Sequence, residues 1–229
     1  HVDIYSPPRL TILLTGDELI PPGNPLGFGE VYESNSVQLC GALNQLGIKD
    51  IKIHHIPDDP KQLKVAMDRS LENADILLLV GGVSVGDYDF VTAVAKECGI
   101  EQRFHRIRQK PGKPMFFGTK KQKLVFGLPG NPSSALTCFY MYVAPALQEL
   151  MQTPSRIKKI TVPITHDYRK KAGLTHFLKG SYDGASVTAL HAQESYRMQS
   201  FAQANCLIVI PADTELVCAG SLLNAYIDL

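Results

Sequence analysis

The turn that follows residues 76–80 holds the strongest sign of chemistry in this sequence. Residues 76–80 are a run of five aliphatic side chains, which is typical of a buried strand. The polar and glycine residues that come next are Gly81, Gly82, Ser84, Gly86 and Asp87. Glycine lets backbone N–H groups approach a ligand, and the start of a following helix attracts anions. Because a carboxylate opposes a plain anion site, the turn predicts either a bridging cation or a ligand that combines a donor-rich ring with an oxyanion.

Three more turns of similar composition end three other predicted strands, at Leu10–Leu14, Ile51–His54 and Leu124–Phe126. The residues in these turns are Thr15, Gly16, Asp17, Glu18, Asp58, Asp59, Pro129, Gly130, Asn131, Pro132, Ser133 and Ser134. Ligands of an open parallel sheet bind beyond the carboxyl ends of its strands, so we expect the four turns to form one cleft. Each turn also has a simpler role, because acids before Pro60 or an asparagine before a proline can cap a helix.

The charges in and near these turns suit a phosphorylated ligand. Clustered carboxylates repel one another unless a cation or a proton relieves them. Oxygen ligands suit Mg²⁺, which typically takes one or two carboxylates together with substrate phosphates. Lys110 and Lys113 lie in a loop with two prolines and suit a phosphate or another oxyanion. The simpler alternative for these lysines is a solvated basic loop.

The elements that must position these turns fall into two groups. Strand-like and helix-like patterns alternate over residues 1–152, which predicts an α/β domain with a three-layer arrangement and a mostly parallel sheet. From Thr153 onward the pattern changes to alternating apolar and polar residues, with Asp183-Gly184 as a strong hairpin signal. We expect a small β-barrel or sandwich domain over residues 153–229.

The sequence predicts one helix that begins near Ser34 and another that begins at Pro132. One helix is expected to start at Ser34, Asn35 or Ser36 and to end at Gly47. Its expected apolar positions are Val37, Cys40, Leu43 and Leu46. A second helix is expected from Pro132, and Pro145 should kink or end it.

The bulk composition is that of an ordinary globular protein. The 229 residues are 45% hydrophobic and 20% charged, with a formal net charge of +1, which argues against a general nucleic-acid or membrane-surface binder. The five cysteines show no CxxC spacing, so we expect a reducing, cytoplasmic location. No apolar run reaches membrane-spanning length and no signal peptide opens the chain. The first residue is His rather than Met, which we interpret as processing, a tag or a cut from a longer chain.

Five motifs in order resemble the molybdenum insertase family, the MoeA-type molybdopterin molybdenumtransferases that include the gephyrin E domain. The motifs are Thr15–Leu19, Ser34–Ser36, Gly81–Phe90, Lys110–Pro114 with Phe117-Gly118, and Gly127–Ser134. The resemblance runs from about Val2 to the C-terminus and implies a molybdopterin-binding fold followed by a small β-barrel. It implies that molybdenum passes from molybdate to adenylylated molybdopterin (molybdopterin-AMP), with release of AMP and help from a divalent cation, usually taken as Mg²⁺.

The resemblance also implies roles for individual residues. The catalytic candidates are Glu18, Asp58 or Asp59, Asp87, Lys110 and Lys113. Glu18 and Asp87 are the candidate metal ligands, and the two lysines are candidates for holding molybdate. The substrate-binding candidates are Thr15, Gly16, Asp17, Ser34, Asn35, Gly81, Gly82, Ser84, Gly86, Pro129, Gly130, Asn131, Pro132, Ser133 and Ser134.

Full-length members of this family carry two further domains ahead of the strand at Leu10 and form a homodimer whose cleft takes residues from both subunits. We therefore expect this chain to be a fragment that keeps the pocket but has little activity alone. One alternative is a molybdopterin adenylyltransferase of related fold, although the β-rich region after Thr153 opposes it. A non-enzymatic, gephyrin-like scaffold is the second alternative, and a generic nucleotide-binding module is the third.

Overall fold

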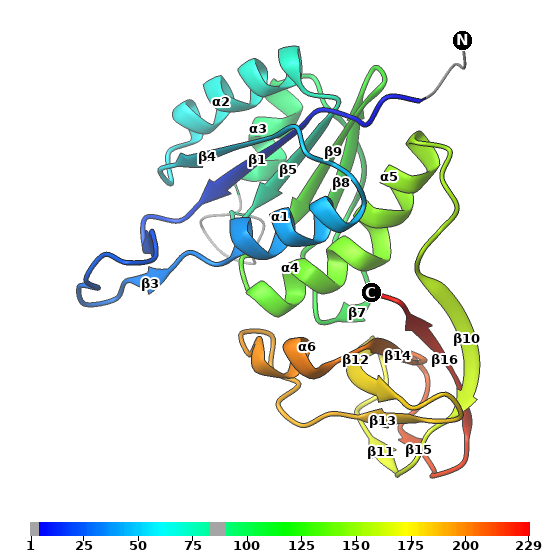
Figure 1. Ribbon diagram of the computed structural model, residues 1–229. Helices are drawn as coiled ribbons and strands as arrows, with labels where there is room; N and C mark the ends of the chain where they lie inside the picture. Colours follow the sequence, from blue (N-terminus) through cyan, green and yellow to red (C-terminus); the bar gives the residue numbers. More distant parts are fainter. Residues whose placement is uncertain (1–4, 83–89) are drawn as a thin grey trace.

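Six strands form the larger sheet of the computed structural model, which describes residues 5–82 and 90–229 (Figure 1). In chain order these strands are β1 (Leu10–Thr15), β4 (Ile51–Ile56), β5 (Ile76–Val80), β6 (Glu101–His105), β8 (Phe116–Lys120) and β9 (Lys123–Leu128). Their order across the sheet is β4-β1-β5-β9-β8-β6. The first four run parallel, and β8 runs antiparallel to both β9 and β6. The prediction of a mostly parallel sheet is confirmed.

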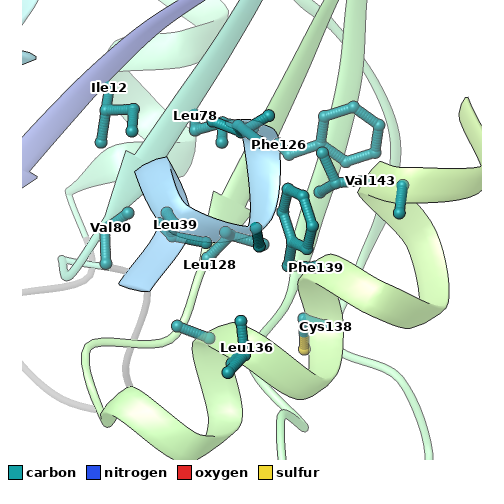
Figure 2. Packing of buried hydrophobic residues seen from close by; sticks show 14 of the residues in the cluster. Ile12, Leu39, Leu78, Val80, Phe126, Leu128, Leu136, Cys138, Phe139 and Val143 are labelled. Carbon is teal, nitrogen blue, oxygen red and sulfur yellow. The ribbon is translucent and has the colours of Figure 1, made fainter. Parts of the chain in front are cut away.

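Helices cover both faces of this sheet. Alternate side chains of a strand point to opposite faces, and every residue of β1 and of β5 is buried, so both faces are covered. The helical elements are α1 (Asn35–Gln45), α2 (Pro60–Asn73), α3 (Val91–Glu97), α4 (Pro132–Cys138), the π-helical turn η1 (Phe139–Val143) and α5 (Ala144–Leu150). On one face Leu78 packs in a cluster with Leu39 of α1 and Phe139 of η1 (Figure 2). On the other face Leu77 packs in a cluster with Leu63 of α2. The three-layer prediction is confirmed.

Two helices differ in detail from the sequence-based prediction. In α1 the buried face is formed by Asn35, Ser36, Leu39, Ala42 and Leu43. Val37 was expected to face the core but is 66% exposed. Pro145 does not end its helix, because α5 continues beyond it, and a π-helical turn lies just before it. The other expected effect, a kink, stays a prediction. A proline lacks the N–H that an α-helix needs and clashes with the carbonyl four residues earlier, so a wider turn at that point relieves both problems.

A second sheet follows, in which five strands have the order β10-β16-β14-β12-β13 and each runs antiparallel to its neighbours in this order. Its strands are β10 (Lys158–Pro163), β12 (Thr175–Tyr182), β13 (Val187–Ala189), β14 (Cys206–Ile210) and β16 (Leu222–Ile227). The hairpin expected at Asp183-Gly184 joins β12 to β13. The barrel prediction needs correction, because the described residues contain no closed barrel. The two edges of the sheet meet only at an isolated bridge between Ile164 and Val187, which is too short to make a continuous ladder.

Short elements complete the fold. The paired strands β2 (Leu19–Ile20) and β3 (Val31–Tyr32) belong to an arm that extends away from the larger sheet (Figure 1). The strands β11 (Tyr168–Arg169) and β15 (Leu216–Val217) form a separate pair, and α6 (Gln199–Gln203) precedes β14. Among residues 5–82 and 90–229, no helix is both long enough and apolar enough to span a membrane.

The chain crosses between the two sheets at β7 (Gln109–Lys110), which pairs in parallel with the start of β12. Next to this pairing, the Arg108 guanidinium donates two hydrogen bonds to the carbonyl of Gly173, at 3.1 and 3.0 Å. The amide of Thr175 donates to the carbonyl of Arg108 at 2.9 Å. A segment from the first predicted domain therefore completes the sheet of the second, and the boundary at residues 152 and 153 stays a prediction.

Candidate active site

A cleft of about 1230 Å³ opens at the carboxyl ends of the four parallel strands. All four of the predicted turns contribute to its walls. The contributing residues in those turns are Thr15, Gly16, Asp17, Glu18, Asp58, Gly81, Gly82, Pro129, Gly130, Asn131, Pro132 and Ser134. The strand order explains this meeting, because β4, β1, β5 and β9 lie side by side and end at one edge.

Glycine at position 81 is required by the close approach of neighbouring turns. Its φ is 89°, and an added Cβ would lie 2.4 Å from the carbonyl oxygen of Thr15. The Gly81 amide also donates to the carbonyl of Leu128 at 3.2 Å, so Gly81 is fixed between the ends of β1 and β9. No larger residue fits this arrangement without moving the backbone.

Two acids from different turns, Asp17 and Asp58, are joined by hydrogen bonds at the edge of the cleft. The amide of Asp58 donates to Asp17 Oδ1 at 3.1 Å, and the amide of Asp17 donates to Asp58 Oδ2 at 3.4 Å. Burial raises the pKa of the Asp58 carboxyl, and the charges of Asp17 and Glu18 raise it further. These carboxylates therefore repel one another, which a bound cation or proton would relieve. Within the described ranges, no three acids, histidines or cysteines group closely enough to hold a metal ion.

Asp59 has a different role from its neighbour. It is the N-cap of α2, and its Oδ1 accepts hydrogen bonds from the amides of Lys61 and Gln62 at 2.7 and 3.3 Å. The hydrogen bond from the Gln62 side chain is the largest cause that lowers the pKa of Asp59. Of the two candidates Asp58 and Asp59, only Asp58 lines the cleft.

Lys110 and Lys113 line the cleft on a loop that the protein interior holds in place. Gln109 is 3% exposed and donates to the carbonyl of Pro111 at 2.9 Å. Its carbonyl oxygen accepts a short hydrogen bond from the hydroxyl of Tyr142 in η1. The loop also packs tightly against α4, since a Cβ on Gly112 would lie 2.4 Å from Cys138 Sγ. This packing fixes the loop backbone that carries both lysines.

Asn35 lines the cleft and also supports the turn after β9. Its side-chain amide donates to the carbonyl of Gly130 at 2.8 Å. Gln38 donates both to Asn35 Oδ1 at 2.7 Å and to the carbonyl of Pro132 at 2.9 Å. The start of α1 is thereby joined to the start of α4. Ser34, the neighbouring candidate, also lines the cleft.

Residues 11–149 of the chain match the family described as a probable molybdopterin binding domain, and residues 161–227 match the MoeA C-terminal region, domain IV. The first match alone covers more than half of the chain. The chain belongs to this MoeA-type molybdopterin-binding family. The resemblance of the five sequence motifs is confirmed.

Relatives of this MoeA-type chain are found in bacteria, animals and archaea. The molybdopterin molybdenumtransferase of Haemophilus influenzae is 34% identical over 98% of this chain and 57% of that protein. The molybdenum cofactor synthesis protein cinnamon of Drosophila melanogaster is 31% identical over 98% of this chain and 39% of that protein. A solved MoeA protein from Pyrococcus horikoshii has a TM-score of 0.82 at 30% identity, over 97% of this chain and 55% of that one. The chain thus spans between 39% and 57% of the length of these relatives.

Some predicted site residues are not among those that line the cleft. Asp59 caps α2, as described above. Ser133 is fully buried, and the structure gives its hydroxyl no hydrogen-bond partner. Ser84, Gly86 and Asp87 lie outside the described residues, so their places in the cleft stay predictions.

One wall of the cleft, which no sequence motif predicted, comes from the second sheet region and the β7 segment. The main residues in this wall are Arg106, Gln109, Leu174, Gln193, Ser195 and Tyr196. Asn131 Nδ2 donates to Ser195 Oγ at 3.1 Å, and the Ser133 amide donates to the Ser195 carbonyl at 3.1 Å. No motif marks this wall in the sequence, because the pairing of β7 with β12 brings it to the cleft.

Proposed function

We propose that this chain forms the substrate-binding part of a molybdopterin molybdenumtransferase, which inserts molybdenum from molybdate into molybdopterin-AMP and releases AMP. One observation carries the proposal. Acidic residues from the turns after β1 and β4 share a single cleft with two lysines of the β7 loop. That combination suits a ligand that is anionic and also binds a divalent cation.

The lysines and the acids have separate tasks in this proposal. Lys110 and Lys113 hold the molybdate oxyanion near the sulfur atoms of molybdopterin, and catalysis gains mainly from this proximity. A water molecule attacks the adenylyl phosphorus, the bond from that phosphorus to the terminal phosphate oxygen of molybdopterin breaks, and AMP is released as the molybdopterin phosphate departs from it. As the two Mo–S bonds form, the two thiol protons and one oxo oxygen of molybdate leave as water. The fixed loop described above keeps both ammonium groups in place while negative charge develops on the leaving group.

Mg²⁺ fits the donor set, since the cleft offers carboxylate oxygens whose mutual repulsion a cation relieves. We propose Glu18 and Asp87 as its protein ligands, with Asp58 close to Asp17 and contributing to the same negative field. Two carboxylates with substrate phosphates are enough for Mg²⁺. When bound, the ion would neutralise charge on the leaving phosphate.

Binding measurements on this chain test the proposal directly. Isothermal titration calorimetry should show that the chain binds AMP in the presence of Mg²⁺ and, in a separate titration, that it binds molybdate. Replacing Lys113 by Ala should weaken molybdate affinity about tenfold, which corresponds to loss of one favourable charge interaction. Lys49→Ala is the matched control, because Lys49 is an exposed lysine before β4, at the far end of the strands from the cleft. Absence of binding by the unaltered chain, or equal affinities for both variants, would count against the proposal.

The activity of the complete protein needs a separate assay. We propose that the full-length protein is a cytoplasmic homodimer, as its MoeA-type sequence implies, and that turnover requires segments outside this chain. With molybdopterin-AMP, molybdate and Mg²⁺, the 229-residue chain should release little AMP. Asp87→Asn in the full-length protein should reduce AMP release sharply at limiting Mg²⁺. Near-full turnover by the chain alone would disprove the requirement for further segments.

A further inference from the structure

Lys179 of β12 is a buried lysine whose ammonium group donates hydrogen bonds to the backbone of one loop, residues 192–197. Its residue is 2% exposed. Its Nζ donates to the carbonyls of Ala192, Glu194 and Arg197 at 2.9, 3.3 and 3.1 Å. An ammonium group has three donors, and here all three are used within residues 192–197. Burial of a charge is costly unless it is hydrogen-bonded in this way.

The same loop is fastened to the backbone of Lys179 as well. The Lys179 amide donates to Gln193 Oε1 at 3.0 Å, and Gln193 Nε2 donates back to the Lys179 carbonyl at 2.8 Å. Ser200 Oγ donates to the carbonyl of Ala192 at 2.7 Å. Residues 192–197 have no helix or strand, and these hydrogen bonds hold their backbone in place.

This loop forms part of the cleft wall. Gln193, Ser195 and Tyr196 all line the cleft, and Tyr196 is 63% exposed. Ser195 contacts the N-terminal end of α4 through the side chain of Asn131 and the amide of Ser133. A shift of the loop would thus change both the wall and its contact with α4.

We propose that Lys179 is a positioning residue for the cleft. Its ammonium group sets the backbone conformation of residues 192–197, and this conformation determines how the wall meets an anionic ligand. The inference rests on the proposed function for the identity of that ligand. Lys179 itself does not line the cleft, so its effect on binding is transmitted through the loop.

Two substitutions and one control test this inference in the 229-residue chain. Lys179→Met keeps the length of the side chain and removes the donors, whereas Lys179→Arg keeps a charge and several donors. Lys123→Met is the matched control, because Lys123 Nζ also donates to carbonyls, those of Ala74 and Glu72 at 2.7 and 3.4 Å. That control site lies beside the start of β9, at the other end of the strands from the cleft.

Hydrogen exchange measured by mass spectrometry reports on the loop, and titration with AMP plus Mg²⁺ or with molybdate reports on the cleft. We expect Lys179→Met to speed exchange in residues 191–198 and to weaken affinity for at least one ligand by about tenfold. Lys179→Arg should give intermediate values. Lys123→Met should lower the melting temperature without either effect.

Each result decides for or against the inference. Loop exchange in Lys179→Met equal to that of the unaltered chain would overturn it, as would faster loop exchange with unchanged affinity for both ligands. If Lys179→Met does not fold, Lys179→Arg decides, and exchange and affinity equal to those of the unaltered chain would overturn the inference. If the unaltered chain binds neither ligand, the proposed function fails, while the exchange comparison still shows whether Lys179 sets the loop.

Discussion

Asp17 and Asp58 each accept a hydrogen bond from the other's backbone amide, at 3.1 and 3.4 Å, although both side chains are acids. This reciprocal pair joins the turn after β1 to the turn after β4. The arrangement brings negative charge together at the cleft before any ligand binds. The repulsion between these carboxylates lowers the stability of the folded chain and favours binding of a cation.

We expect Asp58→Asn to stabilise the chain at neutral pH. Burial is the largest cause that raises the pKa of Asp58 above 3.8, its ordinary value, and the charges of Asp17 and Glu18 add to it, whereas the hydrogen bond from the Asp17 amide lowers the pKa by less than burial raises it. The folded state therefore favours protonated Asp58, and this contribution is present below pH 3.8 and is lost as pH rises through the folded pKa. The variant should have a higher melting temperature at pH 7, and the difference should shrink as pH falls toward 3.8. A lower melting temperature at pH 7 would contradict the argument.

Gly81→Ala should destabilise the chain by roughly 1–3 kcal/mol, because the backbone must shift to accept a Cβ in an unfavourable conformation. The predicted clash is with the carbonyl of Thr15, at 2.4 Å. Gly41→Ala is the matched control, since Gly41 lies inside α1 with no atom within 4 Å of an added Cβ. That change should stabilise by about 0.5–1 kcal/mol. Urea denaturation of both variants measures the two signs, and two equal shifts would refute the role given to position 81.

Leu78→Ala should cost roughly 2–5 kcal/mol of unfolding free energy, because it leaves a cavity in a packed core. Leu78 is fully buried in β5, in the cluster that Figure 2 shows. Val37→Ala, at a residue that is 66% exposed, should change stability by no more than about 0.5 kcal/mol. Chemical denaturation of the two variants separates a core position from a surface position of similar chemistry.

Thiol labelling should distinguish the five cysteines by burial. Burial raises the pKa of Cys138 to about 12 and those of Cys98 and Cys206 to about 11. Because the thiolate is the reactive form, these three should resist a disulfide reagent at pH 8 in the folded chain. The exposed Cys218 should react first. Rapid labelling of Cys138 without unfolding, detected by mass spectrometry of peptides, would show that its surroundings are more open than described.

The sequence predicted the parts of the fold that rest on local pattern. The aliphatic run of β5 and the Asp183-Gly184 hairpin depend on neighbouring residues, and both are confirmed. The buried side of α1 was partly missed, since its polar residues Asn35 and Ser36 are buried. Asn35 donates to the carbonyl of Gly130 in the turn after β9, and Ser36 donates to the carboxylate of Glu33. Helical spacing does not reveal these contacts.

The rest of the candidate site depends on pairing between distant segments. The strand β7 has only two residues and pairs with β12 far along the chain. The loop with Ser195 and Tyr196 has no apolar periodicity, and its place in the wall follows from buried contacts with Lys179. No local pattern encodes such contacts, so the sequence predicted one side of the cleft and left out the other.

The crossing at β7 has a consequence for the order in which the protein takes shape during synthesis. Arg108 and its acceptor Gly173 are 65 residues apart, so β7 leaves the ribosome well before the strand with which it pairs. Closing so long a stretch of chain carries an entropic cost that later contacts must offset. The parallel strands can assemble early, whereas β7 reaches its final pairing only after Thr175 and His176 of β12 have been made. A nascent chain therefore cannot present the whole cleft before Tyr196, which forms part of its wall, has been made.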